Sequence, residues 1–251
     1  MGASAIEFRL RMLINTIIIV LGFWAPWIGN RGAWAGLGPY VALLEWLALR
    51  VSRAGLASFT DAVPVVIAVA ALCAALGAVL RVWGTAYLGS GTVQSSQMQA
   101  GSVVASGPYR YLRNPLYLGL WFMTAALAFL MPPSGALFAI VLITLFQLRL
   151  IFGEEAFLTE RIGEAYIAYR RAVPRLVPRL RGAPAHAGQK PQWLRALLSE
   201  LTPIGVFVAL VFFSWTYNNG LLVRIILISF GLSLVARALL MGKPDRQAKT
   251  A

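Results

Sequence analysis

Long apolar runs separated by short polar breaks make up most of the chain. Three runs carry no charge, at residues 12–28, 62–80 and 114–148, and two weaker runs follow at 203–217 and 221–240. A transmembrane helix needs about 20 mostly apolar residues, so each run predicts a membrane helix. The 114–148 run is long enough for two, and Pro132-Pro133-Ser134-Gly135 divides it because proline ends a helix. This run is therefore predicted to form a helical hairpin.

The N-terminal runs allow more than one interpretation. Ala33-Trp34-Ala35 resembles a signal-peptidase site, but the 12–28 run is long for a signal peptide, which favours an uncleaved first helix. The run at 32–49 contains Glu45 and fits either a second span or a helix in the membrane interface. The pattern predicts an all-α integral membrane protein with six or seven transmembrane helices. We divide it into N-terminal membrane helices (1–62), a core (63–182), and a linker with a C-terminal helical hairpin and basic tail (183–251).

Composition agrees with a membrane protein and adds an orientation. Hydrophobic residues make up 59% of the chain and charged residues 12%, with a mean hydropathy of +0.73, whereas soluble domains carry about 25% charged residues. The net charge of +13 would also suit nucleic-acid binding, but the basic residues flank apolar runs, which argues against it. Sixteen of the 22 Lys and Arg residues fall in 81–113, 149–200 and 237–251, so these segments are predicted to face the cytoplasm. The side on which Arg9 and Arg11 lie depends on whether 32–49 spans the membrane.

Cysteine and histidine are too few for several kinds of chemistry. Cys73 is the only cysteine, which excludes an intrachain disulfide and a cysteine cluster for metal or iron–sulfur binding. His186 is the only histidine, which makes a histidine-ligated metal site or a Ser-His-Asp triad improbable. No metal site is expected.

Two long polar segments, 83–114 and 153–201, lie on the same predicted side and flank the hairpin. The first ends in Gly-Pro-Tyr-Arg-Tyr-Leu-Arg-Asn-Pro-Leu-Tyr-Leu-Gly, where Asn114 and Pro115 predict a helix start, with Asn as the cap and Pro in the first turn. Helical spacing then places Arg113 and Tyr117 at the mouth of the span, and Gly119 allows a backbone or ligand to come close. The alternative is a capped helix with an interfacial Arg and an aromatic-belt Tyr.

The second segment opens with Glu154 and Glu155, which are expected directly after the hairpin's second helix. Adjacent carboxylates at a membrane edge are costly, so they indicate a site for a cationic ligand or, alternatively, a solvated helix end paired with Arg113, Arg149 or Arg161. An amphipathic helix that covers the pocket is expected next. Its apolar face would carry Leu158, Ile162, Ala165, Tyr166 and Tyr169. Pro174 and Pro178 should end this helix in an extended strip against the headgroups.

In this order and spacing, these elements resemble the isoprenylcysteine carboxyl methyltransferases and the related phospholipid N-methyltransferases over residues 63–180. The resemblance implies S-adenosylmethionine bound in a cytosolic pocket between the hairpin and the amphipathic segment, with a lipid-like or prenylated acceptor entering from the bilayer. It implies catalytic roles for Arg113 and Tyr117. The cofactor-binding residues that it implies are Asn114, Pro115, Tyr117, Gly119, Glu154, Glu155, Tyr166 and Tyr169. Isoprenylcysteine enzymes usually have Arg-His-Pro where this chain has Asn114, which weakens prenylcysteine specificity more than methyl transfer.

The function expected from the sequence is therefore S-adenosylmethionine-dependent methyl transfer to the carboxylate or amine head of a lipid-like acceptor. A carboxylate is already a nucleophile at neutral pH and an amine must first be neutral, so no catalytic histidine is needed. The expected enzyme is isoprenylcysteine carboxyl methyltransferase-like, and three alternatives remain, of which a phospholipid N-methyltransferase is the first. Membrane sterol reductases share a similar Pro-x-Tyr-x-Gly element and use a nicotinamide cofactor, but usually have an acidic residue where this chain has Leu120. A non-enzymatic transporter or assembly factor would favour ionisable residues inside its spans, and these spans hold almost none.

Overall fold

The computed structural model describes residues 2–25, 41–95, 98, 103–179 and 188–241, and every regular element in this part of the chain is helical. This confirms the all-α prediction. The elements are α1 (Ala5–Arg9), α2 (Arg11–Trp24), α3 (Leu43–Arg53), α4 (Phe59–Leu88), α5 (Ser90–Gln94), the 3-10 helix η1 (Gly107–Arg110), α6 (Pro115–Ala128), α7 (Pro133–Ile162), α8 (Glu164–Ala172), α9 (Trp193–Ser199), α10 (Leu201–Thr216) and α11 (Asn219–Met241). His186, on which the histidine argument rested, lies outside the described residues.

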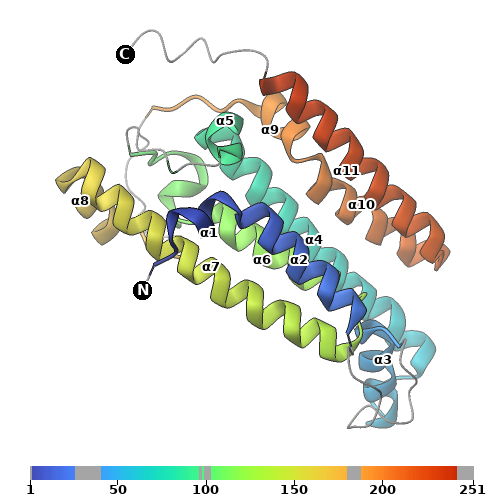
Figure 1. The fold of residues 1–251 in the computed structure, drawn as a ribbon. Helices are drawn as coiled ribbons and strands as arrows, with labels where there is room; N and C mark the ends of the chain where they lie inside the picture. Colours follow the sequence, from blue (N-terminus) through green and yellow to red (C-terminus); the bar gives the residue numbers. More distant parts are fainter. Residues whose placement is uncertain (1, 26–40, 96–97, 99–102, 180–187, 242–251) are drawn as a thin grey trace.

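The long helices run side by side as one bundle (Figure 1). Helices α4 and α6 pack against each other at its centre, with α7 and α2 on one side and α10 and α11 on the other. One apolar core joins α4, α6 and α10 around Ile67, Met123 and Leu210, and a second joins α2, α6 and α7 around Ile18, Met131 and Ile143. The short elements α5, η1 and α8 gather at one end of the bundle, and α3 lies at the other.

Three described helices are long and apolar enough to cross a membrane: α4, α7 and α11 up to Leu239. The pair α9 and α10, bent by 67°, makes a fourth if it counts as one broken span. Helices α2 and α6 are apolar but have 14 residues each, about 21 Å at 1.5 Å per residue, which is shorter than a hydrocarbon core of about 30 Å. The fold is that of an integral membrane protein, and the count of six or seven spans stays a prediction.

Helix α3 occupies the end of the bundle where the hairpin turns. The amides of Leu43 and Leu44 donate hydrogen bonds to the carbonyls of Met131 and Phe129, at 2.7 and 2.9 Å. The first half of the predicted second run, residues 32–40 of 32–49, lies outside the described residues, and α3 covers its last part. Helix α2 runs to this end and α4 starts from it. Arg11 therefore lies at the opposite end, where its Nη2 donates to the carbonyl of Val93 in α5 at 3.1 Å.

The hairpin begins and turns where the sequence predicts, at Pro115 and Pro133. The expectation that its second helix ends before Glu154 is wrong. Helix α7 continues to Ile162 because no proline or glycine pair interrupts it, and it stops at Gly163, whose φ of 71° suits glycine. This break also divides the predicted amphipathic helix into the end of α7 and α8. Glu154 and Glu155 consequently sit on a continuous helix rather than at a loose helix end.

The close crossing of α2 and α7 depends on glycine. A Cβ added at Gly135 would lie 1.8 Å from the carbonyl oxygen of Gly22, so a methyl group there must push the two helices apart. We expect Gly135→Ala to lower the free energy of unfolding by about 1–3 kcal/mol, the usual cost of overpacking. The matched control is Gly231→Ala in α11, where no atom lies within 4 Å of an added Cβ. Thermal unfolding in detergent tests this. If Gly135→Ala and Gly231→Ala melt at the same temperature, the tight crossing of α2 and α7 is contradicted.

Candidate functional site

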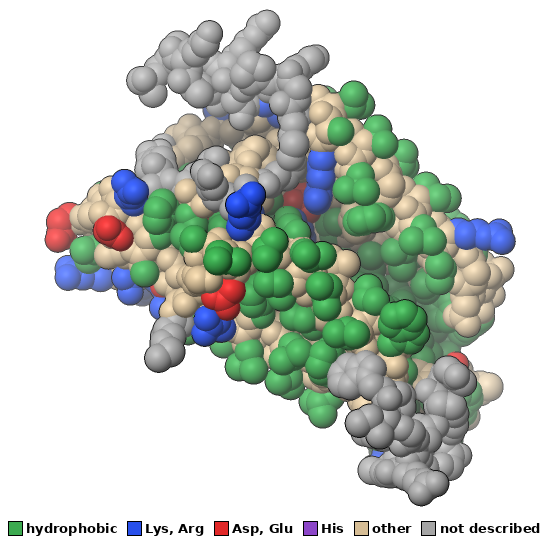
Figure 2. All heavy atoms as spheres, viewed as in Figure 1, with side chains coloured by type: hydrophobic (Ala, Val, Ile, Leu, Met, Phe, Trp, Pro, Cys, Tyr) green, Lys and Arg blue, Asp and Glu red, His purple; other side chains and the backbone are tan. Residues whose placement is uncertain are grey.

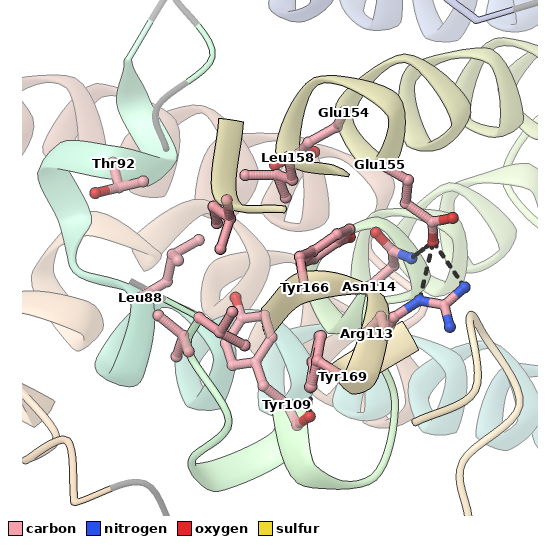
Figure 3. Close-up of a pocket in the computed structure, with 13 residues that line it drawn as sticks. Leu88, Thr92, Tyr109, Arg113, Asn114, Glu154, Glu155, Leu158, Tyr166 and Tyr169 are labelled. Carbon is pink, nitrogen blue, oxygen red and sulfur yellow. Dashed lines mark hydrogen bonds and ion pairs between the residues drawn. The ribbon is translucent and has the colours of Figure 1, made fainter. Parts of the chain in front are cut away.

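A cavity of about 300 Å³ lies at the end of the bundle formed by α5, η1 and α8 (Figure 3). This volume is at the lower end of the range for small-molecule sites, about 300–1,000 Å³. One part of its wall is apolar and the other carries carboxylate, amide, guanidinium and phenol groups. The lining residues are Leu88, Thr92, Val103, Val104, Tyr109, Arg113, Asn114, Glu154, Glu155, Leu158, Ile162, Tyr166 and Tyr169.

The start of α6 positions Asn114 in this wall. Asn114 is the residue before Pro115, as predicted, but its side chain makes no capping hydrogen bond. Its Nδ2 instead donates to Oε1 of Glu155 at 3.3 Å and to the carbonyl oxygen of Arg175 at 3.2 Å. The predicted capping role of the side chain is therefore wrong, because the buried carboxylate of Glu155 and a nearby carbonyl take its donor. Asn114 ties the beginning of α6 to α7 and to the segment after α8.

Glu155 is the hub of a buried ion cluster. It is 4% exposed, and its carboxylate lies 3.0 Å from Nη2 of Arg113 and 2.8 Å from Nη2 of Arg175. The other terminal nitrogen of Arg113 donates to the carbonyls of Arg170 and Val173 at 2.8 and 2.6 Å. The hydrogen bond with Glu155 raises the pKa of Arg175. The cluster holds the segment after α8 against the hairpin. Of the predicted arginine partners of the two glutamates, Arg113 pairs with Glu155, whereas Arg149 pairs with Glu7.

Glu154 is placed differently from its neighbour. Its Oε2 accepts a hydrogen bond from the Tyr117 hydroxyl at 2.8 Å. Among the described residues it forms no ion pair within 4.0 Å, although it lines the cavity. Figure 3 shows the two glutamates on successive positions of α7, with Glu155 directed to Arg113 and Glu154 lying towards Leu158. Of the two carboxylates, only Glu154 has a charge that remains available to a ligand.

Three tyrosines form the side of the cavity opposite α7. The hydroxyl of Tyr169 donates to the carbonyl of Tyr109 at 2.8 Å, and the rings of Tyr166 and Tyr169 lie 5.9 Å apart. The Tyr109 hydroxyl is buried and has no hydrogen-bond partner among the described residues. Burial raises the pKa of Tyr109, and burial together with the charge of Glu155 raises the pKa of Tyr166 to about 12. These hydroxyls are therefore neutral donors at physiological pH.

Three of the predicted site residues do not line this cavity. A Cβ at Gly119 would lie 2.8 Å from Cγ of Arg81 and 3.1 Å from the carbonyl oxygen of Gly77, so Gly119 faces α4. Pro115 is fully buried at the start of α6. Tyr117 reaches Glu154 from a second, smaller cavity. The structure brings together the other six: Arg113, Asn114, Glu154, Glu155, Tyr166 and Tyr169.

The sequence interpretation missed the lining residues Thr92, Val103 and Val104, whereas Leu88 opens a Gly-Ser-Gly run that resembles the Gly-x-Gly cofactor element of the phospholipid enzymes. Leu88 and Thr92 enter the cavity where α4 ends at Gly89 and α5 begins. The Leu-Gly-Ser-Gly at 88–91 is a weak sign of this, since such a run is also an ordinary turn. The strip after α8, expected against the headgroups, instead pairs with the segment before α6. There the amide of Arg113 donates to the carbonyl of Pro174 at 2.8 Å, and the amide of Arg179 donates to that of Tyr111 at 2.9 Å.

Fold and cavity together define a helical membrane protein with a partly polar cavity at one end of its bundle. Residues 65–165 match the model of the family described as phospholipid methyltransferase. Neither a curated protein nor a solved structure matched the chain. The matched segment includes α6, α7 and most of the cavity wall. The match confirms the resemblance seen in the sequence: residues 65–165 are similar to a family of integral membrane methyltransferases.

Proposed function

We propose that this protein transfers a methyl group from S-adenosylmethionine to the polar head of a long-chain, lipid-like acceptor. The observation that carries the proposal is Glu154, a carboxylate in the cavity wall with a phenol as its only hydrogen-bond partner among the described residues. Glu154 is partly buried. A charge taken partly out of water without an ionic partner is costly, and a cationic ligand relieves that cost. S-adenosylmethionine carries a sulfonium and an ammonium group.

The residues of the cavity fit this cofactor. Glu154 would hold the ammonium or the ribose hydroxyls, and the free hydroxyl of Tyr109 would make a further hydrogen bond. Leu88, Leu158 and Ile162 offer an apolar wall for the adenine ring. Arg113 has its donors directed to Glu155 and two carbonyls, so we assign it a positioning role, in which it holds the wall in place. Tyr117 orients the carboxylate of Glu154.

When bound, S-adenosylmethionine supplies an electrophilic methyl group. The protein's own contribution is alignment and exclusion of water, which can supply several kcal/mol. Tyr166 and Tyr169 in α8 cover the cavity, held there by the bonds of Arg113 to the carbonyls of 170 and 173. The basic segments that flank the cavity support a cytoplasmic location for it. Arg9 and Arg11 lie at the same end of the bundle and strengthen that orientation.

Calorimetry on the purified protein tests the proposal. We expect saturable binding of S-adenosylmethionine, and of the demethylated thioether product, with no binding of a reduced nicotinamide cofactor. Binding of the nicotinamide cofactor in place of S-adenosylmethionine would favour the reductase alternative and overturn the proposal. Binding of neither would favour a non-enzymatic membrane protein.

Removing the Tyr109 hydroxyl should raise the stability of the ligand-free protein and lower its affinity for the cofactor. Tyr109→Phe removes a buried hydroxyl that lacks a partner, so the ligand-free protein should become slightly more heat-stable. If the cofactor bonds this hydroxyl, the same change should weaken cofactor binding by about 0.5–1.5 kcal/mol, roughly two- to tenfold. Calorimetry and thermal unfolding measure the two effects. Tyr217→Phe, at an exposed turn 51% accessible, is the control, and unchanged affinity in Tyr109→Phe would remove Tyr109 from the site.

A further inference from the structure

We infer that residues 2–11 brace the cofactor site and that Arg11 is a positioning residue for it, because Arg11 holds α5, and with it Thr92, in the cavity wall. The inference rests on the proposed function and goes beyond it, since this segment lies outside residues 65–165, which match the methyltransferase family. It gives the N-terminal segment a part in cofactor binding.

Helix α5 is too short to be stable alone. It has five residues, Ser90–Gln94, whereas an isolated helix of fewer than about 12–15 residues is marginal even in a favourable sequence. Yet α5 carries Thr92, which lines both the cofactor cavity and the smaller cavity beside Glu154. Figure 3 shows Thr92 of α5 and Glu154 of α7 on separate parts of the cavity wall. The shape of the site therefore depends on contacts that hold α5 in place.

Arg11 supplies such contacts at the end of α5. Its Nη2 donates to the carbonyls of Val93 and Ser95, at 3.1 and 2.6 Å. The last carbonyls of a helix have no partner inside the helix, and an arginine side chain can satisfy them. The guanidinium is itself fixed, since its Nη1 donates to the carbonyl of Phe8 at 2.9 Å and its central carbon lies 4.1 Å from the centre of the Phe8 ring. Phe8 is buried in the core beside α7.

The other end of the segment is anchored to α7. The amide of Ala3 donates to the carbonyl of Arg149 at 2.8 Å. The two backbones touch there, because a Cβ added at Gly153 would lie 2.8 Å from the carbonyl oxygen of Ala3, and one at Gly2 would lie 2.8 Å from Cα of Gly153. Gly153 precedes Glu154 in α7. The N-terminal segment therefore joins the helix that carries Glu154 to α5.

The segment reaches the site from the border of the apolar surface. Figure 2 shows hydrophobic side chains over α2 and α7, and charged side chains gathered towards the end with α8. Arg11 begins α2 near that charged end. A basic side chain is favourable there, because the edge of a membrane span on the cytoplasmic side attracts arginine and lysine.

Arg11 acts by position rather than by charge. It lines the smaller cavity together with Glu154, but its terminal nitrogens bond carbonyls. Among the described residues, the two side chains form no ion pair within 4.0 Å. A positive charge near the site repels a cationic cofactor. Removing Arg11 would therefore strengthen cofactor binding if its charge decided the effect, and weaken it if Arg11 holds α5.

Calorimetry on Arg11→Met tests the inference. Without its hydrogen bonds α5 must be ordered when the cofactor binds, so the affinity falls with the fraction of protein that is already competent. We expect about tenfold weaker binding, the scale of one hydrogen bond to a charged group. The loss should be equal for S-adenosylmethionine and for its thioether product, since it does not depend on the sulfonium charge. Arg11→Lys keeps the charge but not the planar fork, and should recover only part of the loss. Arg9→Met, at an exposed position, is the matched control and should bind like the wild type.

Hydrogen exchange in the ligand-free protein gives a readout that does not need the cofactor. The amides of residues 90–94 should exchange about tenfold faster in Arg11→Met than in Arg9→Met, because local opening becomes easier, whereas those of α6 should not change. Unchanged exchange in α5, equal cofactor affinity in the two variants, or tighter binding of S-adenosylmethionine by Arg11→Met would overturn the inference. Absence of cofactor binding in the wild type would instead overturn the proposed function, while faster exchange at 90–94 would still show that Arg11 holds α5.

Discussion

Glu154→Gln should weaken the binding of S-adenosylmethionine by about 1.5–3 kcal/mol, roughly ten- to a hundredfold. The change keeps the shape of the side chain and its hydrogen bond with Tyr117, which lies 2.8 Å away. It removes the negative charge, and no other carboxylate in the cavity is free of arginine. Calorimetry at two salt concentrations measures the effect, and the loss should be smaller at high salt because salt screens partly exposed charges.

Two variants separate binding from structure. Glu155→Gln leaves Arg113 and Arg175 without their shared carboxylate, so we expect it to lower the melting temperature as well as the affinity. Glu160→Gln, on the exposed part of the same helix, should change neither. If Glu154→Gln binds the cofactor as tightly as Glu160→Gln does, Glu154 has no part in cofactor binding.

The local features of the sequence predicted the framework of the site. Proline has no amide hydrogen and a fixed φ, so Pro115 and Pro133 mark helix starts from sequence alone, and both helices begin there. The uncharged run 114–148 is long enough for two membrane helices, and the prolines inside it predicted the turn of the hairpin. Four members of the predicted apolar face, Leu158, Ile162, Tyr166 and Tyr169, line one cavity even though Gly163 divides their helix. The fifth, Ala165, is exposed and does not line it.

The difference between Glu154 and Glu155 could not be predicted, because it depends on residues distant in the chain. Neighbouring positions on a helix point about 100° apart, and here that turn sends Glu155 to Arg175 and Glu154 to Tyr117. Nothing in the sequence near Arg175 distinguishes it from Arg170 or Arg171. Tyr109 belonged to the recognised motif, but only the packing of η1 shows that its hydroxyl is buried without a partner.

The C-terminal helices had no role that the sequence could assign, and Glu200 gives them one. It is 1% exposed at the bend between α9 and α10. Its Oε2 lies 2.7 Å from Nε of Arg81, and its Oε1 accepts bonds from Nη2 of Arg81 and from the Thr85 hydroxyl, each at 2.9 Å. This bidentate pair joins residues 119 positions apart in the chain. It fastens α9 and α10 to α4, which also carries Arg81 in the wall of the smaller cavity beside Tyr117 and Glu154.

Glu200→Ala should therefore be the most destabilising of these changes, at about 3–5 kcal/mol, because it leaves Arg81 buried without a counter-charge. Thermal unfolding in detergent measures it. The exposed ion pair between Arg149 and Glu7, with side chains 44% and 29% accessible, is the contrast: Glu7→Ala should shift the melting temperature little, since exposed pairs contribute little. Replacing both members of the buried pair, as in Arg81→Met with Glu200→Leu, should recover most of the loss, because the cost lies in the unpaired charge. If Glu200→Ala melts at the wild-type temperature, the pair does not hold the C-terminal helices to the core.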